Sequence, residues 1–175
     1  MAVRKLLSLL LIACFIAVPA LAGEPTAPTG IASAIKRTGQ PLPRWASLRG
    51  NEVNMRTGPG FRYPILWVYK RKGLPVEITA EFDTWRRIRD YEGAEGWVHI
   101  ANLSGKRNFI VAGKKTQPIF RGTDAKATLR AEAETGVQGR LARCRDQWCK
   151  VEVDGIKGYM RRDSIWGVYE SEKVE

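Results

Sequence analysis

The feature that most constrains the fold is the segment 53–60, which reads Val-Asn-Met-Arg-Thr-Gly-Pro-Gly. Apolar and polar residues alternate over its first four positions, as a strand with one buried face requires. The Gly-Pro-Gly turn at 58–60 then ends the strand, because proline fixes φ at one turn position and glycine accepts a positive φ after it. Pro64 suits the first position of a returning strand. The segment therefore predicts a strand, a glycine-rich loop and a second strand.

Further strand signals follow this segment at close spacing, separated by turn-rich stretches. No amphipathic stretch of helical length interrupts them. Several short strands within a few dozen residues are typical of a small closed or nearly closed β-barrel. The predicted strands of this first barrel are 52–56, 64–70, 74–82, 84–90 and 96–100.

The second half of the chain repeats the first. Gly73 and Trp85 recur as Gly136 and Trp148 at the same spacing, and the Gly-Trp pair at 96–97 recurs as a Gly-Tyr pair. The sequence therefore predicts an all-β fold class with two tandem small barrels. The expected division of the chain is a signal peptide at 1–22, a proline-rich flexible linker at 23–44, one module at 45–105, a second at 106–167 and a short acidic tail at 168–175.

The first 22 residues have the pattern of a secretory signal peptide. Arg4 and Lys5 precede an apolar run at 6–18, and Ala-Leu-Ala at 20–22 resembles a cleavage site. The sequence at 11–14 also fits a lipoprotein cleavage box with Cys14 as the acylated residue, so a lipid-anchored form remains an alternative. We expect no transmembrane segment after cleavage, because no remaining apolar run is long enough to span a bilayer.

Charge and cysteines suggest the compartment and the partners. The formal net charge is +11, and cleavage after residue 22 would remove two cations and no acid, leaving +9. For an exported protein this favours envelope polyanions rather than nucleic acid as partners, although a solvated basic surface is an equal alternative. Cys144 and Cys149 would remain, in an oxidising compartment. Their spacing predicts a structural disulfide that closes a hairpin, and it does not fit a CxxC redox centre.

Several motifs resemble the bacterial SH3-like (SH3b) family, and in particular its exported tandem form in Gram-negative bacteria. They cover most of 45–167: Arg-Thr-Gly-Pro-Gly at 56–60, Tyr-Pro at 63–64, Gly-Leu-Pro-Val at 73–76, Trp85 with Ile88, and Gly-Trp-Val at 96–98. The resemblance implies a small β-barrel that serves as a targeting or recognition module in the cell envelope, and it places the protein in the periplasm. The second module departs from the pattern, since it lacks the Gly-Pro-Gly turn and has Tyr159 in place of tryptophan.

Residues for catalysis are few. His99 is the only histidine, which excludes multi-histidine metal sites and leaves little basis for a catalytic triad. The sequence has neither a G-x-S-x-G elbow nor a phosphate loop. We therefore expect no enzymatic activity, no cofactor and no metal.

Binding is better supported, through aromatic and basic residues of the first module. Positions 65, 67 and 69 are predicted to share one strand face and 66 and 68 the other, so this strand is apolar on both sides and one side should cover the second module, the Trp45 segment or a ligand. Half-exposed aromatic residues beside arginine suit peptides or sugars, and guanidinium groups bind carboxylates.

The expected ligand is peptidoglycan or its stem peptides. The alternative is an adaptor that binds a peptide segment of another envelope protein. The oligomeric state is not predicted. The candidate ligand-binding residues are Tyr63, Trp67, Trp85, Arg87, Arg89 and Trp97.

Overall fold

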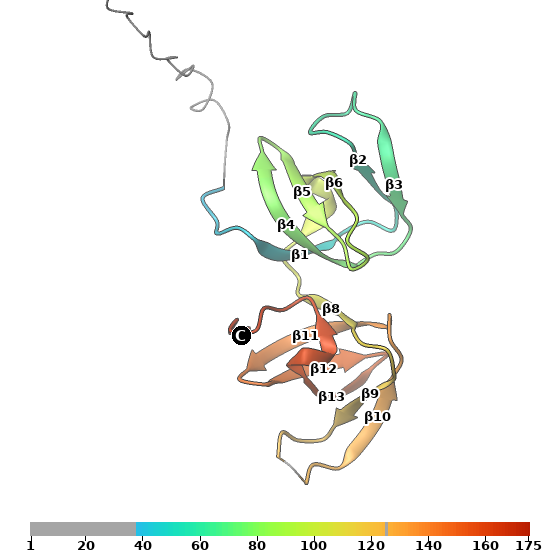
Figure 1. Cartoon of the computed structure of the whole chain (residues 1–175), viewed down its shortest axis with the longest axis vertical. Helices are drawn as coiled ribbons and strands as arrows, with labels where there is room; N and C mark the ends of the chain where they lie inside the picture. The colour runs from blue at the N-terminus through green and yellow to red at the C-terminus, as the bar shows by residue number, and fades with distance from the viewer. Residues whose placement is uncertain (1–37, 125) are drawn as a thin grey trace, which may run out of the picture. The chain divides into compact units, whose positions relative to one another are not determined.

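A computed structural model describes residues 38–124 and 126–175. The predicted signal peptide, Cys14 and most of the predicted linker lie outside this range. The described residues form two seven-stranded antiparallel sheets, one after the other along the chain (Figure 1). This confirms the all-β fold class with two tandem modules. Among the described residues, no helix has the length and apolar character needed to cross a bilayer.

The first module contains seven strands and one short 3₁₀ helix. Its sheet has the order β3-β2-β6-β5-β4-β1-β7, so β3 and β7 are the edge strands. The elements are β1 (Arg44–Leu48), β2 (Val53–Arg56), β3 (Ile65–Tyr69), β4 (Pro75–Phe82), β5 (Trp85–Arg89), β6 (Glu95–His99), η2 (Ile100–Asn102) and β7 (Leu103–Ser104).

The second module repeats this topology, with the strand order β10-β9-β13-β12-β11-β8-β14. Both modules carry a β-bulge at equivalent positions of their longest strand, at Thr79 in β4 and at Ala142 in β11. The elements are β8 (Asn108–Val111), β9 (Gln117–Phe120), β10 (Leu129–Ala133), β11 (Gln138–Arg145), β12 (Trp148–Val153), β13 (Ile156–Arg161), η3 (Arg162–Ser164) and β14 (Ile165–Trp166).

Each module has its own hydrophobic core. In the first, Leu48, Met55 and Ile88 are almost completely buried. In the second, Phe109 and Met160 have the same role, together with both cysteines. Since neither cluster contains residues of the other module, the chain has two cores. Each sheet therefore encloses the apolar face that its own alternating strands provide.

The predicted disulfide is present. Cys144 of β11 and Cys149 of β12 lie opposite each other in the sheet register and are bonded. The bond confirms a structural bridge that holds the β11–β12 hairpin, and both cysteines are buried in the second core. Because it closes a short loop, we expect it to add less than the roughly 3 kcal/mol typical of a 15-residue loop.

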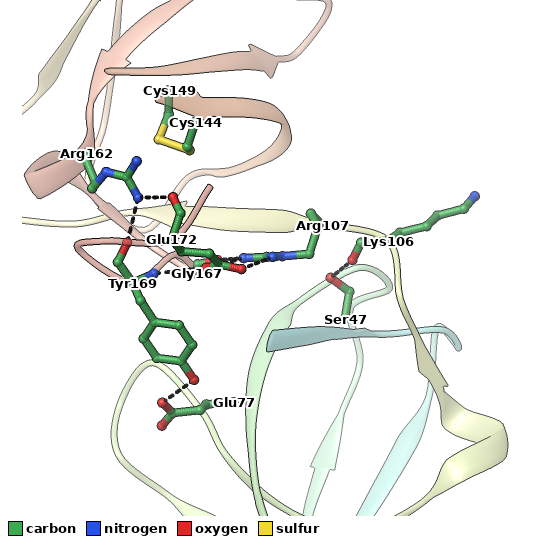
Figure 2. A network of polar contacts seen from close by, with 10 residues as sticks. All are labelled: Ser47, Glu77, Lys106, Arg107, Cys144, Cys149, Arg162, Gly167, Tyr169 and Glu172. Atoms are coloured by element: carbon green, nitrogen blue, oxygen red, sulfur yellow. Dashed lines mark hydrogen bonds and ion pairs between the residues drawn. A yellow bond between two sulfur atoms is a disulfide. The ribbon is translucent and has the colours of Figure 1, made fainter. Parts of the chain in front are cut away.

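The predicted acidic tail at 168–175 is part of the fold. Val174 is buried in the second core and exchanges two backbone hydrogen bonds with Cys144. The carboxylate of Glu172 accepts hydrogen bonds from Arg107 at 2.5 and 3.1 Å (Figure 2). The C-terminal segment is therefore fixed to the module that precedes it.

Side chains also connect the two modules. The Tyr169 hydroxyl donates to Glu77 Oε1 at 2.8 Å (Figure 2). Trp45 packs edge-on against Trp166 with ring centroids 4.6 Å apart. Asn108 Nδ2 donates to the Gly73 carbonyl at 2.7 Å. The Trp45 segment therefore contacts the second module, while the exposed part of β3 does not supply this contact.

Glu81 makes the stability of the first module dependent on pH. Its carboxylate is almost buried at the end of β4 and binds Thr38 and Arg44. Burial by itself raises the pKa of Glu81, but hydrogen bonds from Thr38 and Arg44 and the nearby Arg86 outweigh it and lower the pKa from 4.5 to about 2. Ionised Glu81 therefore stabilises the fold above pH 4.5, and this contribution is lost as the pH falls toward 2.

We expect Glu81→Gln to be less stable than the wild type at pH 6, with a difference that shrinks steadily between pH 4.5 and 2. Urea unfolding of both proteins over this range measures it. A difference that is independent of pH would show that the carboxylate charge has no part in the effect. Glu132→Gln, at an exposed position of β10, is the matched control.

Candidate ligand-binding site

The loop 57–64 closes one end of the first module. The ring of Tyr63 packs on the backbone of Gly58, where an added Cβ would lie only 2.5 Å from the ring. The Tyr63 carbonyl accepts a hydrogen bond from Arg56 Nη1 at 2.7 Å, and the Arg62 guanidinium lies 5.5 Å from the Tyr63 ring. Tyr63 therefore stabilises the loop conformation as well as being partly exposed.

The outer face of β5 and β6 carries an aromatic cluster. Trp85 packs against Phe61 and His99, with ring centroids 5.0 and 5.3 Å away. Phe61 is 72% exposed and covers Trp85, which is only 6% exposed. The expectation that Trp85 is one of the half-exposed aromatic residues is therefore wrong, because Phe61 of the loop 57–64 covers it. Trp97 lies on the same face and is partly exposed.

Arg87 and Arg89 share this outer face, as alternation predicted, and both form ion pairs. Arg87 Nη2 lies 2.6 Å from Glu95 Oε2. Arg89 donates through Nε and Nη2 to Glu77 Oε2, at 2.9 and 2.5 Å. A ligand carboxylate would have to compete with these acids for either guanidinium group.

Trp67 lies apart from this cluster because it takes the side of the core residue Met55, and β3 also contains a bulge. Met55 faces Trp67 across the sheet, whereas the next residue of β2, Arg56, faces Ile65, so Leu66 is an extra residue. A bulge of this kind reverses the faces of the residues on one side of it. The expected common face for 65, 67 and 69 is therefore wrong: Trp67 takes the side of Met55, and Ile65 takes the side of Arg56.

Trp67 stands at the mouth of a groove of about 310 Å³. The exposed fraction of Trp67 is 57%, so its indole is open to solvent and is not packed between modules. The groove walls are mostly apolar, and charged groups of both signs lie at its edge. The residues that line it are Trp67, Tyr69, Arg71, Leu74, Pro75, Val76, Asp90, Tyr91, Glu92, Ile110 and Gly136.

A hydrogen-bond network holds the groove wall. The Tyr69 hydroxyl donates to Asp90 Oδ2 at 2.8 Å, and Asp90 Oδ1 accepts from the backbone N–H groups of Glu92 and Ala94. Burial, with the Asp90 hydrogen bond, raises the pKa of Tyr69 above its ordinary value, so the hydroxyl remains a donor at neutral pH. The turn 90–94 that carries Tyr91 and Glu92 is therefore fixed against β3.

The structure brings four of the six predicted residues onto one face, namely Trp85, Arg87, Arg89 and Trp97. It places Trp67 in the groove and Tyr63 in the loop. Residue patterns did not identify Phe61 or Tyr91 as part of these surfaces, because each belongs to a loop whose path depends on the fold. Phe82 was also missed, although its pairing with Trp85 follows once the β4–β5 register is known.

The same surfaces offer little catalytic chemistry. His99 Nδ1 accepts from the Ala101 backbone N–H at 3.3 Å, and its ring packs on Trp85 and Phe61. Within residues 38–124 and 126–175, no three His, Cys, Asp or Glu side chains gather in a way that could hold a metal ion. The groove and the aromatic cluster instead have the composition of binding surfaces, with apolar walls and few polar groups.

Sequence comparison assigns the family. Residues 49–105 and 113–167 each match the bacterial SH3 domain, one match for each module. The chain belongs to the bacterial SH3 domain family. Domains of this family are binding modules and are generally non-catalytic. No curated protein matches the chain.

Two solved structures from Trichomonas vaginalis, of the proteins named NlpC2 and NlpC1, resemble this tandem bacterial SH3 protein. Both are 12% identical to it, with TM-scores of 0.32 and 0.33. The alignments cover 71% and 74% of this chain and 48% and 47% of theirs. The chain therefore spans about half the length of these proteins.

Proposed function

We propose that this protein is a non-catalytic cell-envelope protein that binds peptidoglycan stem peptides in the Trp67 groove. The observation that carries the proposal is the composition of the groove, which combines an exposed indole, apolar walls and charged groups of both signs. The predicted signal peptide and the disulfide support a location in the periplasm.

The chemistry of a stem peptide is complementary to this groove. Such a peptide is short and carries free carboxylates and an ammonium group. Arg71 at the edge can bind a carboxylate through two N–H groups, and Glu92 can bind an ammonium. The apolar parts of the peptide would cover Trp67 and Tyr91, which are large surfaces that lose little conformational entropy on binding.

The first test is co-sedimentation of the mature protein with purified sacculi at low and high salt. We expect Trp67→Ala to weaken binding about tenfold, as the loss of a central aromatic contact typically does. Arg71→Gln should weaken binding at low salt and reduce its salt dependence. Because Trp67 and Arg71 are exposed, neither change should unfold the protein.

Phe61→Ala is the matched aromatic control, since Phe61 is even more exposed than Trp67 and belongs to the other surface. If Phe61→Ala abolishes binding and Trp67→Ala does not, the site is the aromatic cluster and the groove proposal is wrong. If the wild type remains in the supernatant at low salt, wall binding itself is wrong.

A second candidate function is an adaptor that binds an extended peptide along β3. This strand is an edge of its sheet, and Ile65 and Leu66 are 48% and 52% exposed. An exposed apolar edge strand is a template for strand addition. The corresponding strand β10 carries Arg130 and Glu132 instead. Capture of one envelope protein by the wild type and not by Leu66→Lys, unaffected by removal of the wall, would favour the adaptor.

A further inference from the structure

The outer face of the second module carries a dense group of cations. Strands β11, β12 and β13 lie side by side, and their register places outward-facing residues in three rows. Arg143, Lys150 and Tyr159 form the middle row, and Arg145, Trp148 and Arg161 form the next. Arg140, Glu152 and Lys157 form the third row, and Glu152 is the only acid in the three rows. We call this surface the basic face; its cations are Arg140, Arg143, Arg145, Lys150, Lys157 and Arg161.

The equivalent face of the first module has a different composition. Its rows on β4, β5 and β6 contain two cations, Arg87 and Arg89, and two acids, Glu77 and Glu95. These four residues form two ion pairs, so this face has no excess charge. The same topology therefore supports one neutral aromatic face and one strongly basic face. General solubility does not explain why the cations concentrate on one of two equivalent surfaces.

Aromatic rings lie among the cations of the basic face. Trp148 and Tyr159 are partly exposed, and the Arg161 guanidinium lies 5.6 Å from the Trp148 ring. A cleft of about 540 Å³ opens beside them. Trp148 packs edge-on against Phe120, with ring centroids 5.7 Å apart, and stays partly exposed, whereas Trp85 is buried beneath Phe61. The cleft is lined by Thr123, Ala142, Arg143, Arg145, Asp146, Trp148, Lys150 and Tyr159.

Few acids compensate these charges. Arg145 and Arg161 approach Glu175 and Asp163 only at 3.9 and 3.6 Å, and both acids are mostly exposed, so these pairs are weak. Among the described residues, no carboxylate lies within 4 Å of the charged groups of Arg143 or Lys150. The face therefore has cations available for an external anion.

We propose that the basic face is a second binding site, for an acidic polysaccharide whose sugars carry carboxylates. The planar guanidinium groups of Arg143 and Arg145 bind carboxylates through paired N–H groups. The rings of Trp148 and Tyr159 offer flat apolar surfaces to the C–H faces of the sugars. The site is independent of the Trp67 groove and of its proposed ligand.

The disulfide favours a polysaccharide over nucleic acid. Both are anionic polymers with rings that stack on aromatic side chains. The bond between Cys144 and Cys149 holds the β11–β12 hairpin that carries most of the basic face, and such bonds persist in oxidising compartments. Outside the cytoplasm, acidic glycans are the available polymers of this kind.

The test is calorimetric titration of the mature protein with polygalacturonate. We expect the double change Arg143→Gln and Lys150→Gln to weaken binding about tenfold or more, because two charge-assisted contacts are lost. Lys114→Gln with Lys115→Gln removes the same charge from an exposed loop of the same module and should change affinity less than about twofold. Equal losses in both double variants would overturn the site.

Tyr159→Leu separates ring stacking from charge, since it removes the ring and keeps apolar bulk. It should weaken polygalacturonate binding about fivefold, as loss of one stacking contact does, while its circular dichroism spectrum and binding of polyphosphate stay unchanged. Equal loss for both polymers would overturn the role of the ring. Tighter binding of single-stranded DNA than of polygalacturonate at the same salt concentration would overturn the polysaccharide assignment.

Discussion

Arg162→Met is expected to destabilise the second module by about 3 kcal/mol or more. The Arg162 side chain is 9% exposed, and its guanidinium donates to three backbone carbonyls. Nε donates to the Asp146 carbonyl at 2.7 Å. Nη1 donates to the carbonyls of Tyr169 at 2.6 Å and of Glu172 at 2.9 Å (Figure 2). Methionine would fill part of the space and leave these carbonyls without donors, which costs more than the net value of the bonds themselves.

The loss would also release the C-terminal segment. Arg162 binds the backbone carbonyls of Tyr169 and Glu172 in this segment. The hydroxyl of the same Tyr169 donates to Glu77 of the first module. Urea unfolding measures the change, and limited proteolysis near residue 170 should accelerate in parallel. Arg130→Met on exposed β10 is the control and should change the free energy of unfolding by less than about 0.5 kcal/mol. A similarly small change for Arg162→Met would contradict the role of this network.

The sequence predicted strands β2 to β6 of the first module and missed β1 and β7. β1 was not predicted as a strand, although all of it except Arg44 lies in the predicted first module, because its last three residues, Ala46, Ser47 and Leu48, are all buried and show no alternation. Their burial comes from two sources: Leu48 packs in the core, while the Ser47 hydroxyl donates to the Lys106 carbonyl at 2.8 Å. An alternating pattern reveals a strand that has one face buried and one face exposed to solvent, and β1 has no exposed face.

The face of Ile65 could not be predicted from alternation, because the bulge at Leu66 arises from pairing with β2. A single extra residue changes which side chains share a surface. In the site, Ile65 takes the side of Arg56, whereas Trp67 stays on the side of Met55 and lines the groove. Residue types therefore identified the right kinds of side chain, and strand pairing decided which of them lie together.

The same reason applies to the charges. Arg87 and Arg89 resembled free carboxylate binders in the sequence, but their partners Glu95 and Glu77 come from the two neighbouring strands. The basic face was missed because its six cations are distributed over β11, β12 and β13, where no run of like charges marks them. Only the cross-strand register shows that Arg87 and Arg89 lie beside acids, whereas the cations of the basic face have few acids near them.

The second large effect is expected at the glycines that start the Gly-Trp and Gly-Tyr pairs. Gly96→Ala and Gly158→Ala should each destabilise their module by about 2–3 kcal/mol. A Cβ at Gly96 would lie 2.6 Å from Met55 Cγ and 2.9 Å from the Arg56 carbonyl oxygen. At Gly158 it would lie 2.4 Å from Ile119 Cγ2 and 2.6 Å from a carbonyl oxygen of β9. Because the carbonyls belong to paired strands, they cannot move without disturbing the sheet.

These clashes occur next to a pairing between two strands, since β6 pairs with β2 at Trp97 and β13 pairs with β9 at Tyr159. The methyl group would therefore push apart the strands that bring the aromatic residue to the outer face. Gly105→Ala is the matched control, because a Cβ there meets nothing within 4 Å. Thermal and urea unfolding of the three variants measure the effect, and near-ultraviolet circular dichroism should report a loosened Trp97 or Tyr159. If the three variants were equally stable, close approach between these paired strands would not be the reason for glycine, and the repeated Gly-aromatic pair would need an explanation in ligand binding instead.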